Sequence, residues 1–193
     1  MGTFKVYDLC LIAVLCSLGV VLSSFLQIPI FSDIRIDLSY IVITYISFRY
    51  GGGYGGICAA IIAGVESWIF TSYGFSLSWT CANLFIGLVL GLVFCFNQTK
   101  KQWLKHSINI FTIIVTVAIA MLVIKSSIEV SLYSLSWEIK LPKNAVAFVS
   151  DCLVMIIGYL VVLPRLLKIK ENKNEKEFNI NSITDGSRTN DNS

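Results

Sequence analysis

One acidic residue, Glu66, interrupts an apolar stretch that covers residues 54–70. A charged carboxylate inside a membrane-spanning segment costs about 2.5–3.5 kcal/mol on insertion scales, and acids kept there usually have a function. The functional interpretation of Glu66 is a ligand-binding or ion-handling group that faces an enclosed cavity. The structural interpretation is an acid that is protonated, paired within a helix bundle, or close enough to the outer edge to reach water. We favour the functional interpretation.

Asp151 and Lys125 are a second pair of charged residues at the margins of apolar stretches. Asp151 lies less than two helical turns inside the last stretch, and Lys125 directly follows the fifth one. Both residues fall toward the same side of the predicted membrane, so they could pair across helices. A structural salt bridge and a contact with a ligand are both compatible with this placement.

Trp79 and Asn83 are one helical turn apart, so both should face the same side of a helix. An amide group suits the polar edge of a heterocycle, and an indole ring provides a surface for stacking. The alternative for Trp79 is a belt residue at the membrane interface. Trp137 lies in a polar segment, residues 126–144, that we expect to be an outer loop. This loop could cover an outward-facing pocket or rest its aromatic side chains among the lipid headgroups.

Motifs for metal binding and catalysis are missing from the sequence. Its six cysteines form no CxxC pair and its single histidine does not complete a metal site with them, so we assign neither a metal nor a disulfide. The glycine-rich segment 51–56 is not followed by GK[ST], and no HExxH or GxSxG pattern occurs. We expect this segment to form a tight turn between two closely approaching helices. We predict no enzymatic activity and no cofactor; an intramembrane enzyme that uses Glu66 and Asp151 is a weak alternative.

Membrane-spanning helices would have to hold these residues in place, and the composition of the chain predicts such helices. The chain of 193 residues is 55% hydrophobic and only 14% charged, with a mean hydropathy of +0.75, whereas soluble domains are about 25% charged. Apolar stretches cover residues 9–30, 38–50, 54–70, 79–96, 108–124 and 145–163. The second is short for a crossing of about 20 residues, so it must thin the bilayer or pack on its neighbours. We predict an all-α integral membrane protein with six transmembrane helices in a compact bundle.

The basic residues predict the orientation of this bundle. An even number of crossings places both termini on one side, and that side carries Lys5, Arg49, Lys100, Lys101, Lys105, Arg165, Lys168 and Lys170. Because lysine and arginine favour cytoplasmic loops, we predict that both termini are cytoplasmic. After residue 170 the sequence becomes too polar to form a core. The predicted domains are therefore a six-helix substrate-binding domain, residues 1–170, and a disordered cytoplasmic tail, residues 171–193.

Small residues in two of the stretches favour close helix contacts. Gly87 and Gly91 have GxxxG spacing in the fourth stretch, and Ala13 and Ser17 have small-xxx-small spacing in the first. The face formed by Ala13 and Ser17 would suit docking of a helix from another protein. Packing within the bundle is the alternative.

Four segments, taken in order, resemble the S components, which are the substrate-capture subunits of energy-coupling factor (ECF) vitamin transporters. AVLCSLG at residues 13–19 resembles the docking helix of that family, and IRIDLSYIVI at residues 34–43 resembles the link into its second helix. GGYGGICAAIIAG at residues 52–64 and WTCANLFIGLVLG at residues 79–91 resemble its third and fourth helices. The resemblance is good over residues 8–97 and rests beyond them on length and helix count.

The resemblance implies a multi-pass protein of a prokaryotic cell membrane that captures a vitamin or precursor near its outer face. It would dock through Ala13 and Ser17 on a transmembrane (T) subunit that works with two ATPase subunits, and it implies no nucleic-acid partner. The substrate would be a flat heterocycle similar to folate or riboflavin. Its contacts would come first from Glu66, Trp79 and Asn83, and then from Trp137, Lys125 and Asp151. The alternative is a structural membrane protein of the MreD-like cell-shape type, which would bind no soluble ligand.

Overall fold

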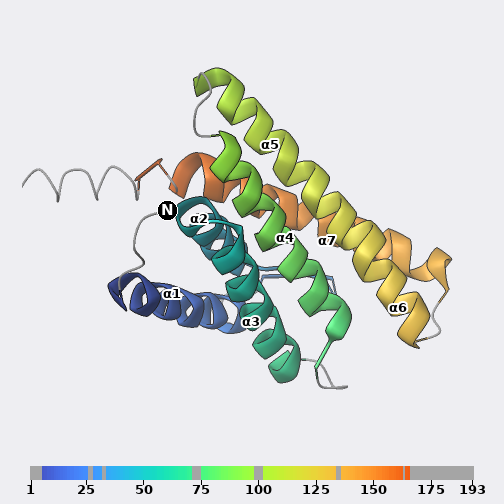
Figure 1. Cartoon of the computed structure of the whole chain (residues 1–193). Helices are drawn as coiled ribbons and strands as arrows, with labels where there is room; N and C mark the ends of the chain where they lie inside the picture. The colour runs from blue at the N-terminus through green and yellow to red at the C-terminus, as the bar shows by residue number, and fades with distance from the viewer. Residues whose placement is uncertain are drawn as a thin grey trace, which may run out of the picture.

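Helices make up nearly all of the computed structural model, which describes residues 6–25, 28–31, 34–70, 75–97, 102–133, 136–162 and 164–165. The elements are α1 (Val6–Phe25), β1 (Ile28–Phe31), β2 (Ile34–Ile36), α2 (Ser39–Tyr50), α3 (Gly52–Phe70), α4 (Leu77–Phe96), α5 (Gln102–Ala118), η2 (Ile119–Lys125), α6 (Ser126–Tyr133), α7 (Trp137–Ile157) and η3 (Gly158–Val162). The π-helical segments η2 and η3 continue the α-helices before them. These ranges therefore form six continuous helical segments (Figure 1).

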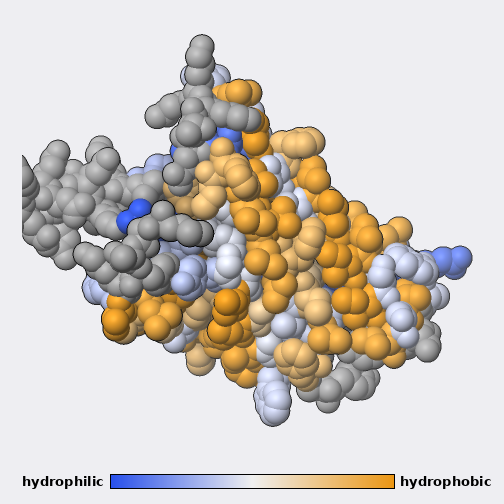
Figure 2. Space-filling view, in the orientation of Figure 1, coloured by the Kyte–Doolittle hydropathy of each residue, from blue (hydrophilic) through white to orange (hydrophobic). Residues whose placement is uncertain are grey.

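Five of these segments are long and apolar enough to cross a membrane. They are Val6–Phe25, Gly52–Ile69, Leu77–Phe96, Trp103–Leu132 and Lys140–Val161. Apolar side chains cover much of the outer surface of the helices (Figure 2), including those of Leu92, Phe111 and Val123. The predicted all-α membrane bundle is confirmed. The cytoplasmic placement of both termini stays a prediction.

The sixth segment, α2, has only 12 residues and lies inside the bundle. It packs against α1, α3, α4 and α7, and Tyr40, Ile43 and Ile46 on it are almost completely buried. The second apolar stretch therefore packs on neighbouring helices, which is one of the two outcomes expected from its short length. As a result, the residues at the start of α2 belong to the interior of the protein.

Glycines bring α3 and α4 into backbone contact. Gly51, between α2 and α3, has a φ of +89°, a conformation that glycine adopts without strain. Gly52 and Gly55 of α3 lie against Gly91 and Gly87 of α4, where an added Cβ on α4 would collide with α3 backbone atoms. The predicted tight turn and close helix contact are confirmed. The contact explains Gly52 and Gly56, whose added Cβ would meet α4. By contrast, an added Cβ on Gly55 would meet Ser47 of α2, and one on Gly53 would meet nothing within 4 Å.

The link before α2 contains more structure than the sequence predicted. β1 and β2 pair as antiparallel strands, with Ile28 opposite Ile36 and Pro29 opposite Arg35. Strands of three or four residues give too short an alternation to be recognised in the sequence. Because β2 also packs against α7, the hairpin fixes where the chain enters α2.

Residues 126–144, predicted as an outer loop, are mostly helical. α6 continues to Tyr133, and α7 begins at Trp137. The prediction was wrong because both helices extend beyond their apolar stretches, where contacts between side chains replace contact with lipid. One such contact is the hydrogen bond that Asn144 Nδ2 donates to Ser126 Oγ, at 2.9 Å.

A disulfide joins Cys16 of α1 to Cys58 of α3, whose Cα atoms are 5.7 Å apart. The expectation of no disulfide was therefore wrong. The two cysteines are 42 positions apart in the sequence, and only the packing of α1 on α3 brings them together. One turn further along α1, Gly19 lies directly against the side chain of Ile62.

The predicted cytoplasmic tail, residues 171–193, lies outside the described residues, and so do Lys5, Lys100, Lys101, Lys168 and Lys170. The division of the chain at residue 170 stays a prediction.

Candidate ligand-binding site

Glu66 and Trp79 meet between α3 and α4. Glu66 lies toward the end of α3, and Trp79 lies in the first turn of α4. The indole nitrogen of Trp79, Nε1, donates a hydrogen bond to Oε2 of Glu66 at 3.1 Å. The glycine contacts between the two helices set the spacing that allows this bond. Two residues predicted to form the site are therefore in direct contact.

Asn83 lies one turn after Trp79 and faces the interior, with only 2% of its surface exposed. Its Nδ2 donates a hydrogen bond to the backbone carbonyl of Trp79 at 3.0 Å. Its side chain also faces the hydroxyl group of Tyr40 on α2. The predicted common orientation of Trp79 and Asn83 is confirmed, and Asn83 connects α4 to the start of α2.

Lys125 reaches the same place from η2. Its ammonium nitrogen lies 4.5 Å from the centroid of the Trp79 ring, within the range of a cation–π interaction. The ammonium group also faces the carboxyl groups of Asp151 and Glu129. Among the described residues no ion pair within 4.0 Å joins Lys125 to Asp151, so their predicted pairing across helices stays a prediction. Lys125 ends a π-helical segment, a type of irregularity that is frequent at functional sites.

Two buried polar atoms here have no hydrogen-bond partner among the described residues. They are the hydroxyl oxygen of Tyr40, a residue that is completely buried, and Oδ2 of Asp151, a residue that is 2% exposed. The two side chains face each other. An unpartnered buried polar group costs about 1–3 kcal/mol, so such atoms are uncommon in folded proteins and need an explanation. A hydrogen bond between these two side chains after a small movement, or a bound molecule with hydrogen-bonding groups, would provide one.

Asp37, between β2 and α2, completes this set of residues. Its Oδ1 accepts a hydrogen bond from the backbone N–H of Ser39 at 2.8 Å, and its Oδ2 accepts one from the Ser39 hydroxyl at 2.7 Å. The carboxyl group is 5% exposed, and burial raises its pKa against the opposing effect of these bonds. It faces both Glu66 and Asp151.

We call Asp37, Tyr40, Glu66, Trp79, Asn83, Lys125 and Asp151 the interior polar cluster. Sequence reasoning did not single out Asp37 or Tyr40 as site residues. A signal for them was available, because residues 38–48 carry no charged side chain and show no polar face, as expected for a buried helix. An acid directly before a buried helix is therefore expected to lie in the interior of the protein as well.

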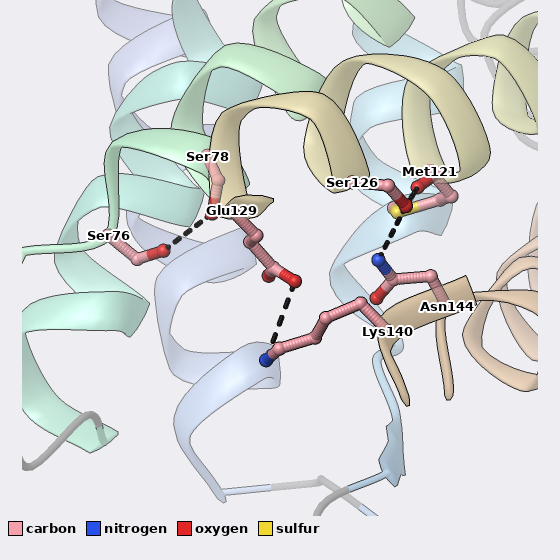
Figure 3. Close-up of polar contacts among 7 residues, drawn as sticks. All are labelled: Ser76, Ser78, Met121, Ser126, Glu129, Lys140 and Asn144. Atoms are coloured by element: carbon pink, nitrogen blue, oxygen red, sulfur yellow. Dashed lines mark hydrogen bonds and ion pairs between the residues drawn. The ribbon is translucent and has the colours of Figure 1, made fainter. Parts of the chain in front are cut away.

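A rim of polar contacts between α6 and α7 adjoins the interior polar cluster. Glu129 of α6 and Lys140 of α7 point toward each other and form an ion pair at 3.5 Å (Figure 3). Beside it, Ser126 Oγ donates a hydrogen bond to the carbonyl of Met121 at 3.2 Å. Glu129 follows Lys125 by one helical turn and faces it. The rim is therefore continuous with the cluster.

Trp137, the remaining predicted binding residue, begins α7 and has 46% of its surface exposed. In the part of the chain that the structure describes, no contact joins it to the interior polar cluster. A role for Trp137 in binding stays a prediction.

Ala13 and Ser17, the predicted docking residues, lie on the exposed side of α1. The buried residues of this helix, Ile12, Cys16, Gly19 and Ser23, form a single stripe on its other side. Ser17 Oγ donates its hydrogen bond to the backbone carbonyl of Ala13 at 3.0 Å. This bond turns the hydroxyl group back onto the helix.

The interior polar cluster combines an aromatic face with hydrogen-bond donors and acceptors. Glu66, Asp151 and Asp37 provide carboxyl groups, while Lys125, Asn83 and Tyr40 provide donors. Among the described residues, no group of three or more histidine, cysteine, aspartate and glutamate side chains could hold a metal ion. The arrangement suits a flat molecule with polar groups at its edges.

Comparisons with known proteins identify a family and a fold. A family model described as "ECF-type riboflavin transporter, S component" matches residues 3–174. A structure of FolT bound with folic acid has a TM-score of 0.60 and 18% identity, over 80% of this chain and 92% of that one. A structure of the S component for biotin from an ECF-type ABC transporter has a TM-score of 0.61 and 20% identity, over 85% and 92%. No curated protein sequence matches the chain. At these identities the two solved structures show the fold.

Proposed function

Because the chain belongs to the S-component family of ECF-type riboflavin transporters, we propose that it captures riboflavin, or a vitamin with a similar flat heterocycle, for uptake into the cell. Proteins of this family bind the transported substrate and are not enzymes. The protein would reside in a prokaryotic cell membrane as a multi-pass protein. Solved structures with the same fold come from systems for folate and biotin, so these vitamins are the competing substrates.

The observation that carries the proposal is the pair of unpartnered polar atoms in the interior polar cluster. The Tyr40 hydroxyl and Asp151 Oδ2 are buried beside Trp79 and Asn83 and make no hydrogen bond among the described residues. A heterocycle with N–H and C=O groups at its edge would give each atom a partner and remove the cost of burying it alone. The same molecule could place its rings beside Trp79.

The remaining cluster residues would fix the orientation of the substrate. Asn83 and Glu66 would offer polar groups to its edge, and Trp79 would provide the stacking surface. In the free protein the ammonium group of Lys125 lies over the Trp79 ring. A stacked ligand would therefore displace Lys125 toward Asp151 and Glu129, the two carboxyl groups that this ammonium already faces.

The proposed partners are a transmembrane (T) subunit and two ATPase subunits of an ECF-type transporter. The exposed surface around Ala13 and Ser17 on α1 supports this assignment, because small residues allow a second helix to approach closely. No motif for nucleotide hydrolysis occurs in the sequence, so the energy for uptake would come from the ATPase subunits.

A thermal-unfolding assay with a panel of vitamins tests the proposal. The purified protein is heated with riboflavin, folic acid or biotin, each in large excess. A ligand at 100 times its Kd stabilises the folded state by about 2.7 kcal/mol, and we expect riboflavin to give the largest shift. The MreD-like alternative predicts no shift with any of the three. A result of that kind in well-folded protein would argue against substrate capture.

A further inference from the structure

Contacts with α2 and α4 hold Lys105 in place at the beginning of α5. Its ammonium nitrogen lies 5.6 Å from the centroid of the Phe48 ring on α2, within the range of a cation–π interaction. Its backbone carbonyl accepts a hydrogen bond from Nδ2 of Asn97, the residue that caps α4, at 3.2 Å. The Phe48 ring packs edge-on against Phe94 of α4, which is almost completely buried. The charge of Lys105 is therefore held over an aromatic surface between α2 and α5.

A buried polar network fixes the same end of α5 relative to α4 and η3. Asn97 Nδ2 also donates a hydrogen bond to Oδ1 of Asn109 at 2.8 Å, and Asn109 Nδ2 donates one to the hydroxyl of Tyr159 at 2.9 Å. The ring nitrogen Nδ1 of His106 lies 2.9 Å from the same hydroxyl. Asn97, Asn109 and Tyr159 are all buried. Because these bonds join three segments, Lys105 belongs to a part of the bundle whose position is well defined.

Arg49 brings a second positive charge to this end of the bundle. It directly follows Phe48, the residue that contacts Lys105, and its side chain is exposed in the last turn of α2. Among the residues that the structure describes, no carboxylate oxygen lies within 4.0 Å of either cation. Arginine and lysine are the residues that proteins use most to bind phosphate groups. The two charges therefore favour an anionic ligand that carries phosphate.

Trp103 indicates the depth of Lys105 in the membrane. Trp103 is 90% exposed and begins the membrane span Trp103–Leu132, and tryptophan is enriched at the interface between membrane and water. An α-helix rises 1.5 Å per residue, so Lys105 lies only about 3 Å further along the helix axis. The charge of Lys105 is therefore at the level of the lipid headgroups, which contain phosphate.

The surface of α5 next to these charges is apolar. Leu104 and Val115 are 53% and 37% exposed, and they are about three helical turns apart, which places them on the same side of α5. A soluble anion such as inorganic phosphate would contact the two cations and leave this side uncovered. A phospholipid would contact both, with its phosphate at the cations and its acyl chains along α5.

We propose that Lys105 and Arg49 bind the phosphate group of an anionic phospholipid whose acyl chains lie along the exposed side of α5. Basic pockets between membrane-spanning helices bind lipid headgroups in this way. A zwitterionic lipid carries a positive group beside its phosphate, so the two cations select against it. The site lies at the other end of α4 from Trp79, and it does not depend on which vitamin the protein captures.

Native mass spectrometry of the full-length protein tests the proposal. The protein is released from nanodiscs that contain equal amounts of phosphatidylglycerol, which is anionic, and phosphatidylcholine, which is zwitterionic. We expect the wild-type protein to retain phosphatidylglycerol preferentially. Lys105→Gln or Arg49→Gln should each lower this preference about fivefold, and the double variant about thirtyfold, because each cation near a membrane surface contributes independently.

Two further variants serve as controls for these measurements. Lys105→Arg keeps the positive charge and should keep most of the preference. Lys140→Gln removes an equal charge from the rim, where Lys140 pairs with Glu129, and should leave the preference unchanged. Equal retention of the two lipids by the wild-type protein would overturn the proposal, and so would a preference that survives in the double variant.

Thermal unfolding in nanodiscs of one lipid provides a second measurement and checks that each variant folds. The wild-type protein should have a higher Tm in phosphatidylglycerol than in phosphatidylcholine, and Lys105→Gln should lose most of this difference. Inorganic phosphate, added to the protein in phosphatidylcholine, should not raise the Tm. A rise equal to that produced by phosphatidylglycerol would show that the site takes a soluble anion, and it would overturn the assignment to a lipid.

Discussion

The indole N–H of Trp79 donates to the carboxylate of Glu66, with 3.1 Å between Nε1 and Oε2. The face of the same ring carries the ammonium group of Lys125. An aromatic ring is electropositive at its edge and electronegative over its face, so both charges lie where the ring favours them. A stacked ligand can replace the cation and keep the hydrogen bond. The ring is therefore held in place and still available for stacking.

Replacing Glu66 with alanine should weaken riboflavin binding by about tenfold or more and leave the fold intact. The indole of Trp79 would lose a charged acceptor, and hydrogen bonds to charged groups contribute about 1.5–3 kcal/mol. Isothermal titration gives the affinity, and circular dichroism checks the fold. Trp68→Phe is the control, because Trp68 lies on the same helix with 74% of its surface exposed. Unchanged affinity in Glu66→Ala would exclude an orienting role for this carboxylate.

Replacing Lys125 with methionine should destabilise the ligand-free protein by about 0.5–2 kcal/mol, since it removes the cation from the Trp79 ring. Lys125→Arg keeps a cation and should restore most of this stability. Lys140→Met should have a smaller effect, because ion pairs in contact with water contribute about 0–1 kcal/mol and the Lys140 side chain is 21% exposed. Thermal unfolding of the three variants provides the comparison. Equal losses of stability in Lys125→Met and Lys140→Met would show that the contact of Lys125 with the Trp79 ring does not contribute to stability.

Replacing Gly87 with alanine should separate α3 from α4 and destabilise the protein by about 1–3 kcal/mol or more, as expected for overpacking. The added methyl group would meet backbone atoms of Gly55 and Gly56, which cannot move as a side chain can. Gly53→Ala is a matched control, because nothing lies within 4 Å of its added Cβ. Thermal unfolding in nanodiscs measures both changes. Similar stability in the two variants would contradict the backbone contact.

Replacing Ala13 with tryptophan should preserve vitamin binding and abolish uptake, because a large side chain on the exposed face of α1 would prevent a partner helix from approaching. Binding is measured on the purified protein, and uptake in cells that express the T and ATPase subunits. Phe111→Trp, on the exposed side of α5, should affect neither. Full uptake by Ala13→Trp would place the docking surface elsewhere.

Replacing Asp37 with asparagine should stabilise the protein relative to the wild type increasingly as the pH rises. Burial raises the pKa of Asp37 above its ordinary value of 3.8. An acid whose pKa is raised by folding favours the folded state at low pH, and this contribution is lost as the pH rises through the folded-state pKa. Asparagine carries no such charge and can still accept the Ser39 N–H. The difference in Tm between the two proteins, measured from about pH 4 to about pH 8, should grow with pH. A constant difference would argue against an ionisable, buried Asp37.

Several features could be predicted because they depend on neighbouring residues. Hydropathy and residue spacing gave the helical frame, the common orientation of Trp79 and Asn83, and the close contact at Gly87 and Gly91. The resemblance to S components, seen in four short segments, agrees with the family match across residues 3–174. Helix ends were predicted less well, since polar residues that continue a helix, as at residues 126–144, look like a loop in the sequence.

The sequence by itself determined that this chain is a membrane bundle with a few acids, amides and aromatic residues in apolar surroundings. It could do so because insertion into lipid depends on the hydropathy of each local stretch of sequence. Which of these residues meet was decided by the tertiary structure. Burial of the short α2 carries Asp37 and Tyr40 inward, and the packing of α1 on α3 pairs Cys16 with Cys58. These contacts join residues from different helices, so their formation depends on how the helices pack and not on any local pattern.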